Sequence, residues 1–169
     1  MSWSSFARPA LLAASMLASG AFLGACSFQP VYSGALASNP TVQIAYAKPT
    51  TRLEQVVYQE LALRLGSSAS EMAPLATVSV ALSSAYIGGM TAAPGVHGPA
   101  RVTATATLTI TRRDGSKVEP VVITRMATAD YTTNSQVLAN NTAYAEAGER
   151  AAKAAAESLR LAVLAELSR

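Results

Sequence analysis

The sequence has one cysteine, one histidine and few charged or aromatic side chains in its 169 residues. A single cysteine cannot form an internal disulfide, and a single histidine cannot build a multi-histidine metal site. Charged residues make up 14% of the chain and hydrophobic residues 50%, which excludes a disordered acidic or basic tail and a coiled coil. The net charge of +3 is too small and too scattered to indicate nucleic-acid binding. The length is sufficient for one domain.

Patterns of catalytic residues are also missing. The sequence contains no nucleophile elbow, no histidine paired with a carboxylate, no phosphate-binding loop and no metal-ligand spacing. We therefore expect that the protein is not an enzyme and that it uses no metal and no cofactor.

What is present begins at the N-terminus. After Arg8, fifteen residues from Pro9 to Leu23 carry no charge. The run is too rich in alanine, serine and glycine, and too short, to span a bilayer, which needs about 20 apolar residues. A short apolar run after a weakly cationic start is typical of a secretory signal peptide.

The run ends in Leu23-Gly24-Ala25-Cys26, which resembles a bacterial lipobox. In that motif the cysteine receives an S-diacylglycerol and an N-acyl chain, and the bond before it is cleaved. We therefore expect residues 1–25 to be a cleaved signal peptide and Cys26 to carry a lipid that anchors the protein to a membrane. The competing interpretation is that Cys26 is an ordinary core cysteine. Ser27, in place of the aspartate associated with inner-membrane retention, favours the outer membrane.

Residues 26–40 contain proline and glycine but no charge and are predicted to be a tether, followed by a single domain over 41–169. Alternating side chains predict a strand over 41–47. Thr51 and Glu54 form a capping box that opens a helix ending near Gly66. Glu60 and Arg64 are spaced to pair on the exposed face of that helix.

Three more strands and a long helix complete the predicted domain. Strands are expected over 76–86, 102–110 and 118–131, with a loop over 88–99, a hairpin turn at Asp114-Gly115 and a helix over 142–167. Pro120 places the last strand at an edge of the sheet or at a bulge. The order predicts an α+β fold, β-α-β-β-β-α, with two helices packed on one face of a four-stranded sheet.

The strand over 102–110 is the clearest element, because its even positions are apolar and its odd positions are all threonine. We expect the threonines to lie on the uncovered face and to contact a partner protein: Thr103, Thr105, Thr107 and Thr109. The alternative explanation is that β-branched polar residues suit any exposed strand. Five cations between 100 and 130 are candidate contacts for the phosphates of an anionic lipid: Arg101, Arg112, Arg113, Lys117 and Arg125. The competing interpretation, ordinary solvated strand ends, is the simpler explanation of these cations.

The segment Cys26-Ser27-Phe28-Gln29-Pro30-Val31-Tyr32 resembles the mature start of the lipopolysaccharide-assembly lipoprotein family LptE, in its alphaproteobacterial form. The Asp-Gly hairpin, an Ala-Asp-Tyr near the end of the fourth strand and a helix opening Ala-Glu-Ala-Gly-Glu-Arg-Ala-Ala follow in the order of that family. The chain departs from the pattern at Ser27, Val31 and Ser33.

The resemblance implies a lipoprotein on the periplasmic side of the outer membrane. Members of that family plug and help assemble the outer-membrane β-barrel LptD, which inserts lipopolysaccharide into the outer leaflet. The implied partners are therefore an LptD-like barrel, lipopolysaccharide and the membrane that holds the lipid on Cys26. The runner-up hypothesis is a periplasmic lipoprotein accessory to another envelope lipid transporter. An arginine-lined site for a phosphorylated glycolipid favours the first hypothesis, and an apolar groove for acyl chains favours the second.

Overall fold

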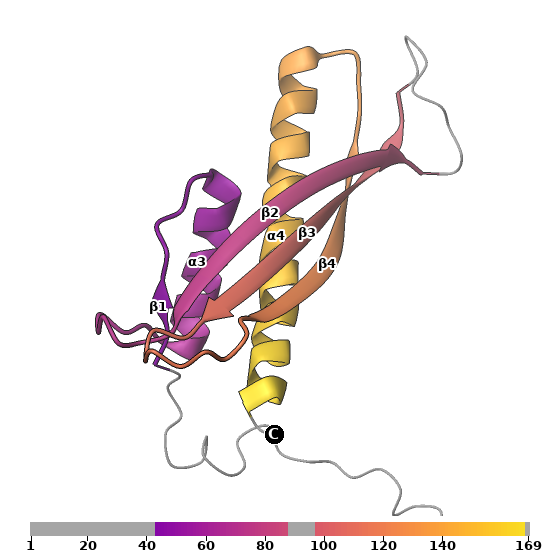
Figure 1. Cartoon of the computed structure of the whole chain (residues 1–169). Helices are drawn as coiled ribbons and strands as arrows, with labels where there is room; N and C mark the ends of the chain where they lie inside the picture. Colours follow the sequence, from indigo (N-terminus) through magenta and orange to yellow (C-terminus); the bar gives the residue numbers. More distant parts are fainter. Residues whose placement is uncertain (1–42, 88–96, 168–169) are drawn as a thin grey trace, which may run out of the picture.

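The computed structural model of the chain describes residues 43–87 and 97–167. The predicted signal peptide, Cys26, the tether and most of the loop over 88–99 lie outside the described residues. Four strands and two helices make up the domain: β1 (Ala45–Tyr46), α3 (Arg52–Leu65), β2 (Leu75–Tyr86), β3 (Pro99–Thr111), β4 (Val121–Thr132) and α4 (Val137–Leu167). The strands lie side by side in sequence order, and both helices pack on one face of the sheet (Figure 1). This confirms the predicted α+β fold and its element order.

The capping box opens α3 as the sequence predicts. The Thr51 hydroxyl accepts a hydrogen bond from the Glu54 amide at 3.2 Å, and the Glu54 carboxylate accepts from the amides of Thr50 at 2.7 Å and Thr51 at 3.2 Å. These bonds, that of Thr50 above all, hold the pKa of Glu54 below its ordinary value. The helix ends at Gly66, whose φ of 84° is a conformation that glycine adopts without a steric penalty.

The core lies between the even face of β3 and the two helices. Val102, Ala104, Ala106 and Leu108 are at most 1% exposed. They share the core with buried leucines of both helices, such as Leu61 and Leu159. The side of α4 that faces the sheet is rich in alanine, which permits a close approach.

Gly148 marks the tightest point of this approach. A Cβ atom on Gly148 would lie 2.8 Å from the Cδ1 atom of Leu82 on β2. The absence of a side chain at this position therefore lets α4 pack directly on the sheet.

Two tyrosines, Tyr46 and Tyr58, pack together at the β1 edge of the sheet. The Tyr58 hydroxyl on α3 accepts a hydrogen bond from the Val78 amide at 2.8 Å, which satisfies a backbone group of β2 beyond the short pairing with β1. The ring of Tyr58 packs edge-on against that of Tyr46, with centroids 5.8 Å apart. The Tyr46 hydroxyl is buried without a hydrogen-bond partner among the described residues, and burial raises the pKa of Tyr46 to about 12.

The first strand is shorter than predicted. It contains two residues and pairs in parallel with the first two residues of β2. Residues 41 and 42 lie outside the described part of the chain, and the strand ends three residues before Pro49.

The predicted start of β4 at Val118 is wrong by three residues. The connection from Arg112 to Pro120 is longer than a two-residue turn, although β3 and β4 do form an antiparallel hairpin. A two-residue type I′ turn needs a positive φ at both central positions, and here Gly115 has φ 77° whereas Asp114 does not. The Asp114 carboxylate instead accepts from the Ser116 amide at 3.0 Å. As predicted for a strand next to Pro120, β4 lies at the edge of the sheet.

The last helix begins five residues earlier than predicted. The asparagine-rich sequence before residue 142 is typical of a loop, but its side chains organise the turn into the helix. Asn134 accepts from the Gln136 amide at 2.8 Å, and Asn140 accepts from the Asn134 amide at 2.7 Å. These bonds allow α4 to start at Val137.

The predicted pair between Glu60 and Arg64 is wrong as well. Arg64 pairs with Glu157 of α4 at 3.4 Å, and Glu157 also accepts from Arg160 at 3.0 Å. The arginine therefore links the two helices, because α4 lies beside α3 on the same face of the sheet.

Candidate functional site

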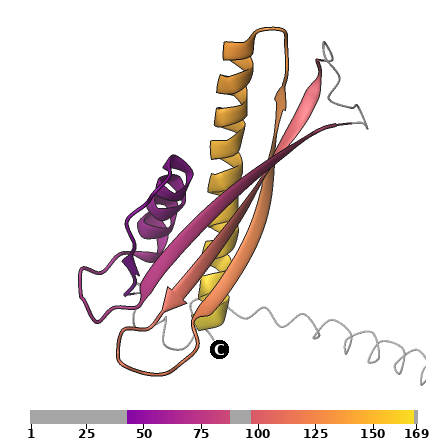
Figure 2. The same ribbon diagram turned by 45° about the horizontal axis from the view of Figure 1, so that its top comes forward.

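The face of the sheet opposite the helices carries mostly hydroxyl side chains. The register places Thr107 of β3 between Ser79 of β2 and Thr124 of β4, and the hydroxyls of Thr107 and Thr124 lie 3.0 Å apart. We call the whole set the hydroxyl face: Thr77, Ser79, Ser83, Thr103, Thr105, Thr107, Thr109, Thr124 and Thr128. Figure 2 shows this face of the three long strands with no helix over it. All four predicted threonines belong to it.

Charge on this face is confined to one end. Among its strand residues only Arg101 and Asp130 are charged, and they form a two-pronged ion pair with distances of 2.6 and 2.9 Å. Arg101 holds the pKa of Asp130 below its ordinary value. The remaining uncovered side chains include two exposed apolar ones on β4, Val122 and Met126. The hydroxyl face is therefore polar, nearly free of charge and built on regular strands.

The five predicted cations do not gather at one place. Arg101 lies at one end of the hydroxyl face, in its pair with Asp130. Arg112, Arg113 and Lys117 lie in the connection between β3 and β4 at the other end of the sheet. Arg125 is in register with buried Ala106, so it belongs to the face that the helices cover. Only the three cations of the connection lie close together in the sequence and in the fold.

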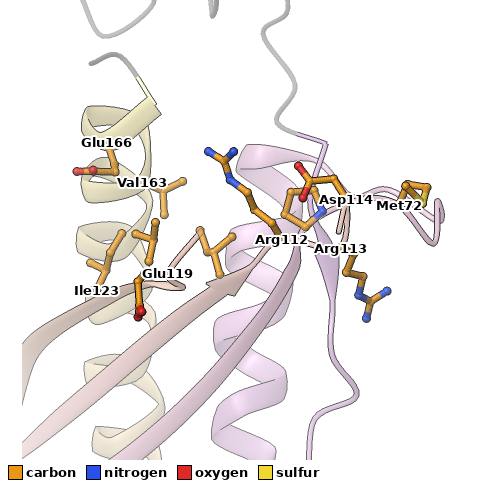
Figure 3. Close-up of a pocket in the computed structure, with 11 residues that line it drawn as sticks. Met72, Arg112, Arg113, Asp114, Glu119, Ile123, Val163 and Glu166 are labelled. Carbon is orange, nitrogen blue, oxygen red and sulfur yellow. The ribbon is translucent and has the colours of Figure 1, made fainter. Parts of the chain in front are cut away.

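A pocket of about 340 Å³ opens beside this connection. Its apolar wall comes from β3, β4, α4 and the segment before β2, and it includes Ile110, Ile123 and Val163. Figure 3 shows Arg112 extending toward α4 and Arg113 pointing away from it. Three carboxylates line the pocket together with these two arginines: Asp114, Glu119 and Glu166.

The electrostatics of the pocket do not favour a phosphate group. The lining carboxylates outnumber the arginines, and hydrogen bonds from Ser116, with a smaller effect of Arg112, hold the pKa of Asp114 below its ordinary value. The wall is largely apolar, so the pocket suits an aliphatic group better than an anion. Sequence reasoning missed this pocket because Met72, Pro74 and Val163 come from segments far apart in the chain.

The described residues contain no group of three or more histidine, cysteine, aspartate or glutamate side chains that could hold a metal ion. The single histidine, His97, is exposed. Within the ranges 43–87 and 97–167, neither helix is long and apolar enough to cross a membrane.

Comparison with known proteins identifies the fold. The sequence matches no protein-family model, and no curated protein is similar to it. Among solved structures, the chain is similar to a candidate lipoprotein from Caulobacter crescentus, with a TM-score of 0.53 and 20% identity over 74% of this chain and 90% of that one. It is also similar to a minor lipoprotein from Acinetobacter baumannii, with a TM-score of 0.51 and 18% identity over 73% of this chain and 90% of that one. The domain therefore has a fold that occurs in bacterial lipoproteins.

Proposed function

We propose that this protein is a lipoprotein of the bacterial outer membrane that acts as a structural partner of an LptD-like β-barrel. In this proposal Cys26 carries the lipid anchor on the periplasmic side, and the sheet and helices form the plug of the barrel. The complex transports lipopolysaccharide and inserts it into the outer leaflet. The role is one of binding and assembly, without catalysis and without a cofactor other than the covalent lipid.

The observation that carries this proposal is the hydroxyl face. In an antiparallel sheet one face commonly packs on the core and the other is polar and faces solvent or a partner. Here β3 presents the half-buried Thr103, Thr105, Thr107 and Thr109 on this face, and one ion pair lies at its end. Thr103 and Thr107 have hydroxyl neighbours on both adjacent strands, whereas Thr105 lies between Ala81 and Met126. Such a surface can form hydrogen bonds with a polar, hydrated protein wall without the cost of burying unpaired charges. The fold, which is shared with lipoproteins, and the lipobox support the anchored half of the proposal.

Contact with lipopolysaccharide is assigned to the connection between β3 and β4. Arg112, Arg113 and Lys117 are exposed there, and Arg113 points away from α4. Arg101 is a weaker candidate because its guanidinium already forms two hydrogen bonds with the Asp130 carboxylate. Arg125 is a weaker candidate because it belongs to the helix-covered face of the sheet, away from the connection.

The apolar pocket favours the second hypothesis, an accessory lipoprotein of another envelope lipid transporter. A cavity of about 340 Å³ with Ile110, Ile123 and Val163 in its wall is within the size range of small-molecule sites and can hold part of an acyl chain. This hypothesis keeps the anchor and the fold and changes the cargo and the partner.

A pull-down from detergent-solubilised outer membrane distinguishes these hypotheses. The tagged, lipidated protein is expected to recover a large β-barrel in near-stoichiometric amount. Replacing Thr105 and Thr107 with glutamate should leave the domain folded and abolish this recovery, because two charges would be buried at the interface. Glutamates at the exposed helix positions Ala145 and Ala154 are the matched control and should not change it.

Two results would contradict the proposal. Equal recovery of the barrel by the Thr105→Glu/Thr107→Glu variant would remove the hydroxyl face from the interface. Recovery of inner-membrane transport components, or of no partner, would favour the second hypothesis. In both hypotheses Cys26→Ser should move the protein out of the membrane fraction; membrane retention of this variant would contradict the lipid anchor.

A further inference from the structure

The outer edge of β4 has no strand beside it in the part of the chain that the structure describes. The sheet order places β4 at one end, with β3 as its neighbour (Figure 1). All 12 residues of β4 pair with β3 in one continuous register, from Val121 opposite Ile110 to Thr132 opposite Pro99. The edge is therefore long and regular, without a bulge that would interrupt the pairing of another strand.

Three hydrogen bonds show which backbone groups face outward. The Thr133 amide donates to the Gly98 carbonyl at 2.9 Å, so odd-numbered residues of this segment point toward β3. The carbonyls of Thr124 and Asp130 accept instead from arginine side chains. Because the two backbone groups of a residue in an antiparallel pair point the same way and the direction alternates, the even-numbered residues of β4 point outward.

Two arginines occupy this edge. Arg125 donates to the Thr124 carbonyl at 2.9 Å, and Arg150 of α4 donates to the Asp130 carbonyl at 3.0 Å. Neither forms an ion pair with a carboxylate in the described part of the chain. Four other arginines do: Arg52, Arg64, Arg101 and Arg160. Each guanidinium at the edge therefore keeps donors for an anionic partner.

We propose that the outer edge of β4 binds an extended, acidic segment of a partner chain as an additional strand. The outward amides and carbonyls of β4 would form the new ladder, and carboxylates of the segment would replace the edge carbonyls as partners of Arg125 and Arg150. Until then the arginines protect the edge from unspecific pairing, as charged side chains do on other edge strands.

The geometry specifies the segment. The two guarded carbonyls are six residues apart, which is about 20 Å along a strand. Arg125 and Arg150 both approach from the helix side of the sheet. The segment therefore needs two carboxylates six residues apart, which an extended chain presents on one face. The inference is independent of the proposed function, because the edge and the hydroxyl face are different surfaces.

The test uses the full-length lipidated protein in detergent micelles and a fluorescein-labelled peptide. The peptide has eleven residues, alternating threonine and valine, with glutamate at its third and ninth positions. Fluorescence anisotropy should show binding, and glutamine in place of both glutamates should weaken it. Arg125→Ala and Arg150→Ala should each weaken it about two- to fivefold, as expected for an exposed ion pair.

Proline tests the edge itself. Thr128 has an outward amide, so Thr128→Pro should leave the ladder to β3 intact and abolish peptide binding, whereas Thr128→Val keeps the amide and should bind normally. Hydrogen exchange needs no variant: the peptide should slow the amides of Met126 and Thr128 at least about tenfold and leave those of Ala127 and Ala129 unchanged.

Each outcome decides the proposal. Absence of binding to the wild-type protein, unchanged binding by a folded Thr128→Pro variant, or uniform protection of even and odd amides would overturn it. Equal binding of the glutamine peptide would overturn its acidic specificity. Alternating protection together with a preference for the glutamate peptide would support it.

Discussion

Tyr58 and Tyr46 are in edge-to-face contact, yet removing the hydroxyl group should have different effects on stability at the two positions. Tyr58→Phe removes the acceptor of the Val78 amide, which lies 2.8 Å away at a residue that is 3% exposed. Tyr46→Phe removes a buried hydroxyl that has no partner among the described residues. Both variants keep the two rings, so hydrophobic burial and the ring contact are unchanged.

The magnitudes follow from the partners left behind. Tyr58→Phe leaves a buried amide unsatisfied, which should lower the free energy of unfolding by about 1–3 kcal/mol. Tyr46→Phe relieves the desolvation of an unpaired hydroxyl, so the free energy of unfolding should stay constant or rise by up to about 1 kcal/mol. The expected difference between the variants is therefore at least about 1 kcal/mol.

Urea unfolding followed by far-ultraviolet circular dichroism measures this difference. The slope of the free energy against urea should be the same for both variants and the wild type, because the surface exposed on unfolding is the same. Equal destabilisation by the two substitutions would refute the reasoning, since it would mean that the loss of the hydroxyl matters irrespective of its partner. A gain of stability in Tyr58→Phe would also refute it.

Three further predictions concern the framework. Thr51→Ala should lower the free energy of unfolding by about 1 kcal/mol in the same urea experiment, because the Glu54 amide loses its capping acceptor; an unchanged midpoint would contradict this. Gly148→Ala should change the free energy of unfolding little, because the Leu82 side chain can shift and alanine favours the helix. Gly148→Leu should lower it by about 1–3 kcal/mol or more, because the larger side chain overpacks the contact with β2. Equal thermal midpoints of these two variants would argue against the close approach. The free energy of unfolding should fall as the pH rises from about 10 toward about 12, because the unfolded chain releases the Tyr46 proton at an ordinary pKa of 10.0 while the folded protein retains it up to about 12. In Tyr46→Phe this decline should be shallower, as measured by urea midpoints at alkaline pH, and an identical decline would assign it to other groups.

The features predicted well from the sequence are local in the chain. The alternation of valine, alanine and leucine with threonine fixes both faces of β3, because side chains in a strand alternate and one face must be buried. The capping box at Thr51 is likewise decided within four residues, by hydrogen bonds between neighbours. The hydroxyl face could therefore be expected from β3 alone, although its width across β2 and β4 depends on the register.

The features that were missed depend on distant segments. Arg64 finds Glu157 in place of Glu60 because α4, nearly a hundred residues later, lies beside α3. The pocket wall and the bond from the Val78 amide to Tyr58 arise in the same way. The cations between 100 and 130 are close in sequence, yet a long hairpin places Arg101 and Arg112 at opposite ends of the sheet.

The two-residue strand β1 has a mechanical consequence. Among the described residues, which begin at Gln43, the first attachments to the rest of the domain are the buried Ile44 side chain and three backbone hydrogen bonds. These bonds link Ala45 to Pro74, Ala47 to Ala76, and Ser68 to Ile44. A pulling force applied through the N-terminus loads these few contacts first, while the long pairings of β2, β3 and β4 stay unloaded. Under tension β1 should therefore detach from β2 at low force, before the sheet that presents the hydroxyl face begins to yield.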